Sequence, residues 1–261
     1  AIVGVDDSVS ANLADQLSRD GIGRVIPISC KEPVSGGVYA IDGQLYDDLD
    51  STCVAVTDLH NIETLPGQHN WQNAAAAFAA ARACGLSIGQ AASGLANYTG
   101  LPHRLEEVAV IDGIRYINDS KATNILAAAQ ALACHSSIYW IAGGRAKDLA
   151  LDTLNHLLSH VVHVFLIGEA AGAFSKKLCR YVPCTISVTL DIAVAQAREA
   201  ALDDGNAISV VLLSPACASF DQFDDFEARG NEFRFLVQKL STLDGEAFTA
   251  NCATPQTESL K

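Results

Sequence analysis

The sequence contains no methionine, few basic residues and no long apolar run. A chain without Met has no initiator, and this one opens directly on what reads as a strand end, so we interpret it as a fragment of a longer protein. No apolar stretch approaches the ~20 residues of a membrane helix, and the N-terminus lacks the basic and apolar regions of a signal peptide. We therefore expect a cytoplasmic protein without a membrane partner.

The shortage of basic residues is large, with 17 Lys and Arg against 30 Asp and Glu, and the formal net charge is −13. A negative balance of this size repels polyanions and argues against nucleic acid as a partner. The eight cysteines show no Cys-x-x-Cys pair and no Cys/His spacing of a zinc site. We predict reduced, mostly buried thiols and no metal site in this chain.

The first 99 residues mix short apolar runs with helical patterns, and 261 residues suffice for two cores. We predict strands at 2–5, 25–28 and 54–59, a hairpin over 37–46 turned by Asp42-Gly43, and helices at 8–17, up to about 84, and at 87–98. Ser8 or Ser10 is expected to cap the first helix. Pro102 biases Leu101 to an extended form, which predicts a domain hinge over 99–104.

After the hinge, apolar strands alternate with amphipathic helices. A hairpin closed by Asp112-Gly113 is followed by predicted strands at 137–142, 162–167 and 208–213, and by helices at 122–134, 151–159, 171–180, 191–203 and about 223–240. This α/β pattern predicts a Rossmann-like domain with a mainly parallel sheet over 100–244. The polar residues 245–261 are expected to be a disordered tail.

Residues 118–124, Asn-Asp-Ser-Lys-Ala-Thr-Asn, lie where a predicted strand gives way to a helix. Such a junction exposes backbone N–H groups and the positive end of a helix dipole, which favours an anionic ligand. Asp119 is suited to accept from ribose hydroxyls, and Lys121 to pair with a carboxylate or phosphate. The alternative is that Asp119 or Ser120 caps the helix and Lys121 points into water.

Other polar motifs also follow predicted strands or open helices. Asn70 and Asn73 share one helix face and can read the edge of a base, unless Asn70 is only a helix cap. His103 and Arg104 stand at the hinge, where Arg104 suits phosphate or is simply solvated. Residues 143–148 offer two glycines, which let backbone approach a ligand, and Lys147. In the loop 214–226, Cys217 is interpreted as a structural thiol rather than a nucleophile, because no base is arranged near it.

Taken together, these segments resemble the Mur ligase family, and within it the members that add D-glutamate. The resemblance covers about residues 1–240 and rests on the order and spacing of the motifs His69-Asn70-x-x-Asn73, Gly100-Leu101-Pro102-His103-Arg104-x-Glu106, residues 118–124, Gly143-Gly144-x-x-Lys147 and residues 212–223. It implies an ATP-dependent amide ligase, expected as a monomer, that phosphorylates UDP-N-acetylmuramoyl-L-alanine and joins it to D-glutamate through an acyl phosphate.

Carried over by motif, the resemblance assigns adenine contacts to Asn70 and Asn73, nucleotide contacts to Arg104 with His103 beside it, and ribose to Asp119. It also places six residues around the D-glutamate end of the product, namely Lys121, Thr123, Lys147, Ser219, Phe220 and Phe226. Lys121 is given a catalytic role as well. For the two phenylalanines, the backbone N–H groups and plain ring packing remain alternative interpretations.

The resemblance also implies parts that this chain lacks. The phosphate-binding P-loop and the magnesium ligands of the family would lie upstream of Ala1, so residues 1–99 are interpreted as the rear of a central ATPase domain, and the chain alone is not expected to catalyse ligation. Rival hypotheses are another ligase of the family, such as one that extends folate with glutamate, a non-catalytic nucleotide- or amino-acid-binding module, and a structural domain without a ligand.

Overall fold

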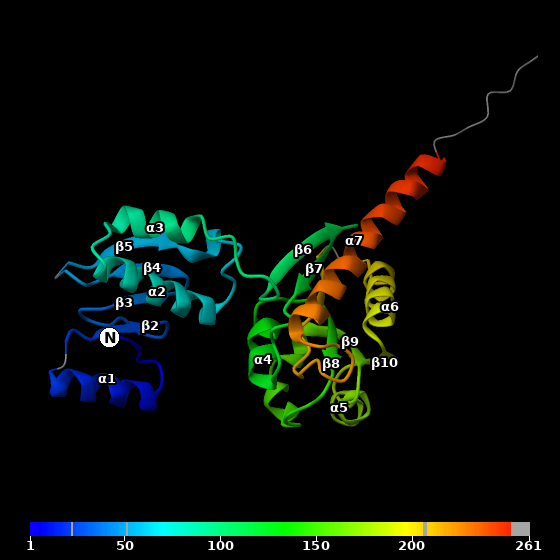
Figure 1. Ribbon diagram of the computed structural model, residues 1–261, viewed down its shortest axis with the longest axis horizontal. Coiled ribbons are helices and arrows are strands. Elements are labelled where there is room, and N and C mark those ends of the chain that lie inside the picture. Colours follow the sequence, from blue (N-terminus) through cyan, green and yellow to red (C-terminus); the bar gives the residue numbers. More distant parts are fainter. Residues whose placement is uncertain (22, 51, 206–207, 252–261) are drawn as a thin grey trace, which may run out of the picture. The chain divides into compact units, whose positions relative to one another are not determined.

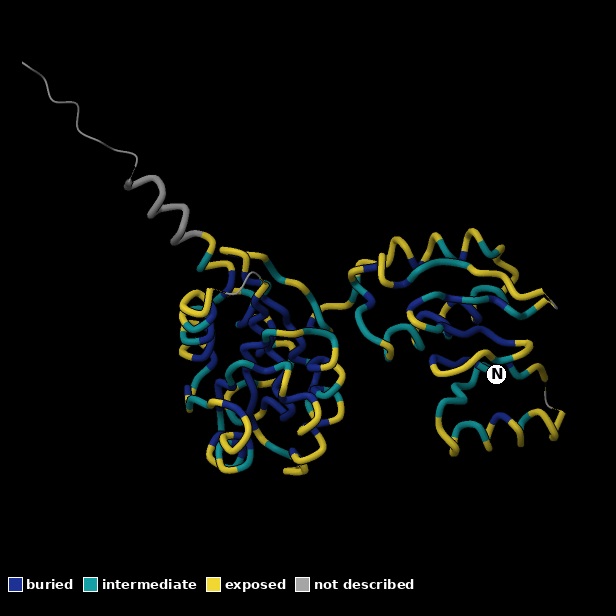
Figure 2. Tube along the Cα trace, turned by 180° about the vertical axis from the view of Figure 1, so that it is seen from behind, coloured by how far each residue is buried: buried dark blue, intermediate teal, exposed yellow. Residues whose placement is uncertain are grey.

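The computed structural model describes residues 1–21, 23–50, 52–205 and 208–251, the last ten for their backbone only. These residues form two compact units, Ala1–Gly100 and a second that begins at Leu101 (Figure 1). In each unit the buried residues lie on the strands and on the helices and loops that pack against them (Figure 2).

The first unit contains a five-stranded sheet in the order β1-β2-β3-β4-β5. Strands β1 (Ile2–Gly4), β2 (Ile26–Ser29) and β3 (Val38–Ile41) run parallel, while β4 (Gln44–Asp47) and β5 (Val54–Asp58) are antiparallel additions. Asp42 and Gly43 have φ of 46° and 77°, as a type I′ turn requires. The predicted hairpin is therefore confirmed.

Three helices accompany this sheet: α1 (Ser8–Asp20), α2 (Gln68–Ala83) and α3 (Ile88–Ala96), with a short 3-10 turn η1 (Leu59–Asn61). The buried alanines of α2 and Phe78 pack with Val38 and Leu45 in one core. The predicted cap of α1 was wrong: the Asp7 carboxylate, rather than Ser8 or Ser10, accepts the N–H groups of Val9 and Ser10.

The second unit contains a six-stranded sheet in the order β10-β9-β8-β11-β7-β6. Its strands are β6 (Glu106–Ile111), β7 (Ile114–Asn118), β8 (Ile138–Gly143), β9 (Val161–Ile167), β10 (Cys184–Val188) and β11 (Ser209–Leu213). Only the edge pair β6–β7 is antiparallel. The predicted mainly parallel, Rossmann-like sheet is confirmed, and the carboxyl ends of β7, β8 and β11 share one edge.

Helices cover both faces of this sheet (Figure 1). On one face, α4 (Ile125–Ala133) and α5 (Ala171–Leu178) pack in a core that includes Trp140. On the other, α6 (Leu190–Asp203) and α7 (Phe226–Asn251) pack in a core that includes Tyr139. Neighbouring residues of β8 thus face opposite cores, because side chains alternate along a strand.

Two predictions in this unit were wrong. The expected helix over 151–159 is replaced by two 3-10 turns, η2 (Leu151–Leu154) and η3 (Leu158–His160). Leu151, Leu154, Leu157 and Leu158 are all buried, so the spacing that predicts an α-helix is met here by two shorter 3-10 turns. Strand β10 was not predicted; it is a short edge strand in which only Ser187 is buried.

The last helix, α7, continues to Asn251, beyond the predicted end near residue 240 and into the tail expected from residue 245. Residues 241–251 contain no proline, so nothing in the backbone forces the helix to stop earlier. The remainder of the predicted disordered tail, 252–261, lies outside the described residues.

Candidate functional site

Three loops that carry predicted site residues meet at the carboxyl edge of the second sheet. They follow β7 (residues 119–124), β8 (residues 144–150) and β11 (residues 214–225). The backbone N–H of Asp119 donates to the carbonyl of Leu213 at 2.8 Å, and that of Gly143 donates to the carbonyl of Pro215 at 2.9 Å. Arg145 and Ala218 exchange backbone hydrogen bonds of 2.9 and 3.0 Å. The sequence motifs are therefore brought together within this unit.

Lys121 lies at the centre of the loop that follows β7. Its N–H donates to the carbonyl of His103 at 3.0 Å, and its ammonium lies 3.7 Å from the centre of the Phe226 ring. The alternative helix-capping interpretation was wrong, because α4 begins at Ile125 and its cap is Asn124, whose side chain accepts the N–H of Ala127. Lys121 is thus held against an aromatic face instead of extending from a helix terminus.

Asp119 is buried, with 8% of its surface exposed. Its carboxylate accepts the Ser214 hydroxyl at 2.8 Å and the N–H of Leu105 at 3.3 Å. Burial raises the pKa of Asp119 to about 7, although these hydrogen bonds and the charge of Arg104 act to lower it. The carboxylate therefore joins the segments that contain Leu105 and Ser214. The positive charge of Arg104 lies close enough to act on the pKa of Asp119.

His103 is also buried and has a left-handed backbone, with φ of 62°. The Asn118 amide donates toward His103 Nδ1 at 3.0 Å, Glu106 Oε2 at 3.2 Å and the carbonyl of Gly230 at 3.1 Å. Because the other two acceptors fix the orientation of this amide, Nδ1 is the acceptor and the ring proton lies on Nε2. Burial lowers the pKa of His103, so its imidazole is neutral.

Glu106 joins this cluster to the last helix. Its carboxylate accepts the N–H of His103 at 2.9 Å and pairs with Arg234 of α7 through hydrogen bonds of 2.5 to 3.1 Å. Gly230 is required at this contact, since a Cβ there would lie 2.2 Å from His103 Nδ1. Glu106 lies in the motif at 100–106, which assigned it no role. Arg234 was not predicted, because its partner is 128 positions away in the chain.

The other predicted residues differ in accessibility. Arg104, Lys147 and Phe220 are exposed, and Phe220 has 62% of its surface accessible. Ser219 is buried at 2%, while Thr123 and Phe226 are half-buried. The exposed cations Arg104 and Lys147 are thus available to an anionic ligand, whereas the Phe226 ring packs between Lys121 and an edge of His103.

Gly143, the last residue of β8, and Gly144 each lie in close contact with neighbouring backbone. A Cβ at Gly143 would lie 2.0 Å from the carbonyl oxygen of Ile167, and one at Gly144 would lie 2.4 Å from that of Ala218. Both glycines have positive φ, of 122° and 129°. The two glycines therefore allow close contact with the end of β9 and with the loop after β11. That they also let backbone approach a ligand stays a prediction.

Cys217 is fully buried, and burial raises its pKa to about 12. A protonated, inaccessible thiol is not a nucleophile. The geometry agrees with the interpretation of Cys217 as a structural residue.

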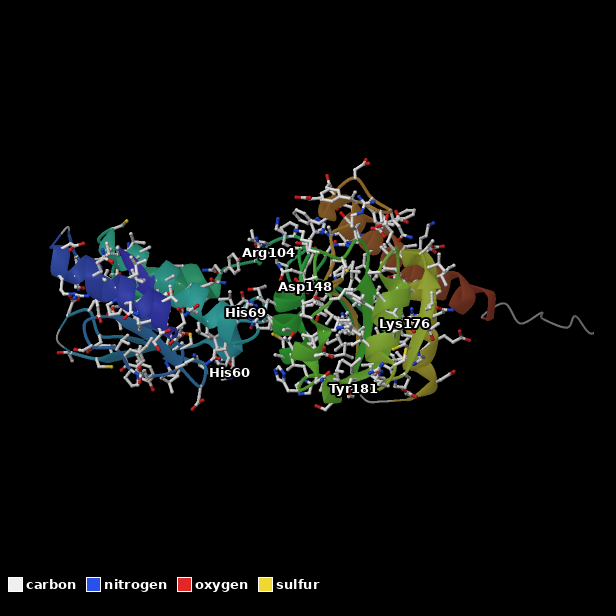
Figure 3. All side chains as sticks on the ribbon, turned by 90° about the horizontal axis from the view of Figure 1, so that it is seen from below. His60, His69, Arg104, Asp148, Lys176 and Tyr181 are labelled. Atoms are coloured by element: carbon white, nitrogen blue, oxygen red, sulfur yellow. The ribbon has the colours of Figure 1, made fainter. Side chains whose placement is uncertain are left out.

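The predicted adenine contacts Asn70 and Asn73 lie on α2 of the first unit, where His69 is labelled in Figure 3, while Arg104 and Asp148 are labelled in the second. Gly67 occupies the cap position of α2, and the Asn70 amide donates to the carbonyl of Pro66 at 2.9 Å. The capping alternative for Asn70 was therefore wrong. Asn73 is exposed.

Within the described part of the chain, no group of three or more His, Cys, Asp or Glu side chains is arranged to hold a metal ion. None of the helices described there combines the length and apolar character needed to cross a bilayer.

The fold defines a class of protein. It matches part of Thermotoga maritima UDP-N-acetylmuramate-alanine ligase, with a TM-score of 0.57, 14% identity and coverage of 91% of this chain and 51% of that one. It also matches Mycobacterium tuberculosis folylpolyglutamate synthase, solved with ADP and AMPPCP, with a TM-score of 0.59, 15% identity and coverage of 89% and 55%. At these identities the likeness shows the fold alone, which this chain shares with parts of both solved structures.

Sequence comparison is more specific. The chain is 47% identical over 250 residues to the UDP-N-acetylmuramoylalanine–D-glutamate ligase of Caulobacter vibrioides, and 50% identical over 238 residues to that of Paramagnetospirillum magneticum. These matches cover 96% and 91% of this chain but 53% and 51% of the relatives, so the chain spans about half their length. No family model matches the chain. The predicted resemblance to D-glutamate-adding Mur ligases is confirmed.

Proposed function

We propose that this chain forms part of an ATP-dependent ligase that joins D-glutamate to UDP-N-acetylmuramoyl-L-alanine in peptidoglycan biosynthesis. The observation that carries the proposal is the 47% identity, over 96% of the chain, to a ligase named for that reaction. The structure supports it by bringing the loops with Lys121, Lys147 and Ser219 to one edge of a parallel sheet, where ligands of such folds bind.

The reaction transfers the γ-phosphoryl group of ATP to an oxygen of the L-alanine carboxylate. The amine of D-glutamate then attacks the carbonyl carbon, a C–N bond forms, the C–O bond to phosphate breaks, and the amine loses a proton. Catalysis of this kind is mainly positioning and charge stabilisation. Exposed Lys147 and the half-buried Lys121 and Thr123 supply cations and a hydroxyl suited to a dicarboxylate.

For the nucleotide, Asn73 and Arg104 are exposed and suit a base edge and a phosphate, while Asp119 has both carboxylate oxygens engaged within the protein. Nδ1 of His103 likewise accepts a hydrogen bond from the Asn118 amide. We assign ribose contact to Asp119, through the lone pairs that its two internal hydrogen bonds leave available, and place His103 beside Arg104, as the motif resemblance implies. Magnesium would take its ligands from residues outside this chain, and no step is attributed to this chain through it.

Calorimetric titration tests the proposal. Wild-type chain is titrated with UDP-N-acetylmuramoyl-L-alanyl-D-glutamate, D-glutamate and ATP, alongside Lys121→Ala and the control Lys176→Ala, an exposed lysine on α5. We expect the product to bind the wild type and the control, and to bind Lys121→Ala about 10-fold or more weakly, as loss of a charged hydrogen bond predicts. A folded wild-type chain that binds none of the three ligands contradicts the proposal.

The rival hypothesis of a folate-extending ligase is not favoured, because the match to a folylpolyglutamate synthase is at 15% identity whereas the D-glutamate ligases match at 47% to 50%. A non-catalytic binding module predicts that the wild-type chain binds the ligands in the same titration. It also predicts that Lys121→Ala does not selectively weaken binding of the product.

A further inference from the structure

Arg229 is a fully buried cation on the first turns of α7. Its Nε donates to Ser120 Oγ at 3.0 Å, and its Nη2 donates to the carbonyls of Ser120 at 2.9 Å and Cys217 at 3.1 Å. Its Nη1 is buried and has no hydrogen-bond partner among the described residues. No motif in the sequence analysis included this residue.

The acceptors of this guanidinium are all neutral. Burial lowers the pKa of Arg229 to about 10, while Cys217 and the carboxylate of Asp221 act to raise it, so the side chain stays charged at neutral pH. Placing a cation in such surroundings costs several kcal/mol, and a well-packed apolar side chain of similar volume is often as stable or more so. Core packing therefore does not explain why a charged residue occupies this position.

The location of the guanidinium suggests a reason. The Ser120 carbonyl directly precedes Lys121 in the chain, and the Cys217 carbonyl lies two residues before Ser219. Nη1 lies 3.3 Å from the place that a Cβ of Gly144 would occupy. One side chain thus hydrogen-bonds the loops after β7 and β11 and lies beside Gly144, which begins the loop after β8.

Ser120 extends this contact to the aromatic ring beside Lys121. Its hydroxyl accepts from Arg229 Nε and donates to the carbonyl of Phe226 at 2.8 Å. The Lys121 ammonium lies over the face of the Phe226 ring. The backbone that precedes Lys121 and the ring against which Lys121 lies are therefore fixed by the same pair, Arg229 and Ser120.

We propose that Arg229 is a positioning residue for the D-glutamate site: its planar guanidinium holds the loops after β7 and β11 in the arrangement in which Lys121 and Ser219 bind the product. This inference rests on the proposed function and adds a residue to it. Arginine is required because its rigid fork reaches three acceptors at once, whereas the ammonium of lysine is a compact point charge.

Hydrogen exchange without ligand tests the positioning directly. We compare the wild type with Arg229→Met, Arg229→Lys and the control Arg198→Met, which removes a mostly buried arginine paired with Asp112 at 2.6 Å. We expect amides at 119–123 and 216–220 to exchange at least about 10-fold faster in Arg229→Met, with β8 and β9 unchanged, and Arg229→Lys to recover part of the protection. Unchanged exchange in these loops, or an equal rise throughout the unit and in the control, overturns the inference.

A double-mutant cycle links the positioning to the ligand. Product affinity is measured for the wild type, Lys121→Ala, Arg229→Met and the double variant, with folding of each checked by circular dichroism. If Arg229 acts through Lys121, the loss caused by Lys121→Ala is at least about fivefold smaller in the Arg229→Met background, while additive losses overturn the link. Should Arg229→Met not fold, Arg229→Lys takes its place. A wild type that binds no product contradicts the proposed function, and hydrogen exchange still decides the positioning.

Discussion

The ammonium of Lys121 lies 3.7 Å from the centre of the Phe226 ring, so a cation from the loop after β7 rests on the first residue of α7. The negative face of an aromatic ring attracts a cation by about 0.5 to 2 kcal/mol. The same ring meets His103 edge-on, with centroids 6.2 Å apart. The orientation of Lys121 therefore depends on a residue 105 positions later in the chain.

Phe226→Ala should weaken product binding by about 2- to 30-fold, because Lys121 loses the ring that orients its ammonium. Phe226→Tyr keeps an aromatic face and should bind the product within about twofold of the wild type. Calorimetry on the folded variants measures both values. Equal affinity of Phe226→Ala and the wild type would show that the backbone of Phe226, rather than its ring, serves the site.

Asp119 should make stability fall as pH rises. Its pKa is raised to about 7 in the folded chain against an ordinary value of 3.8, so the folded state holds the proton more tightly. The stabilisation is complete below about pH 4 and is lost as pH rises to about 7, with a total on the order of 4 kcal/mol.

Asp119→Asn keeps a carbonyl acceptor and cannot titrate. The difference in free energy of unfolding between the wild type and this variant, from urea denaturation between pH 4 and 8, should therefore decline with rising pH. Taking the difference removes the contribution of other carboxylates. A difference that stays constant across this range would mean that the carboxyl of Asp119 titrates normally.

Gly144→Ala should lower the free energy of unfolding by about 2 kcal/mol or more. The new Cβ would meet the Ala218 carbonyl at 2.4 Å, on a backbone whose φ is 129°. Gly172→Ala is the matched control, because Gly172 lies in α5 with nothing within 4 Å of an added Cβ. The control should be unchanged or more stable by up to about 1 kcal/mol. Similar values for the two variants would argue against close backbone contact at Gly144.

Glu106→Ala should destabilise the chain by about 2 to 3 kcal/mol, because it leaves the His103 N–H without its acceptor and removes the carboxylate that pairs with Arg234. Its neighbour Glu107 pairs with Arg115 in an exposed ion pair, in which the two side chains are 39% and 38% accessible. Glu107→Ala should therefore cost about 1 kcal/mol or less. Thermal and urea unfolding of both variants give the comparison, and equal losses would remove the special role of Glu106.

Turns and parallel strands could be predicted because their signals are local. Asp112-Gly113 adopts positive φ at both residues, as Asp42-Gly43 does, since short polar residues and glycine tolerate the left-handed region. The strands of the second unit were recognised from short runs of apolar residues. Strand β10 was missed because an edge strand buries only some positions and carries a weaker pattern.

The alternating α/β order and the position of the polar motifs after strands can be read from the order of residues, because parallel strands present their carboxyl ends at one edge. Which polar groups face outward and which hold the loops together depends on long-range packing. Asn118, Ser120 and Arg229 are buried, and their hydrogen bonds join residues as many as 112 positions apart. Such pairs have no periodicity or spacing in the chain; they exist only where the packing of α7 on the sheet brings their atoms within about 3 Å.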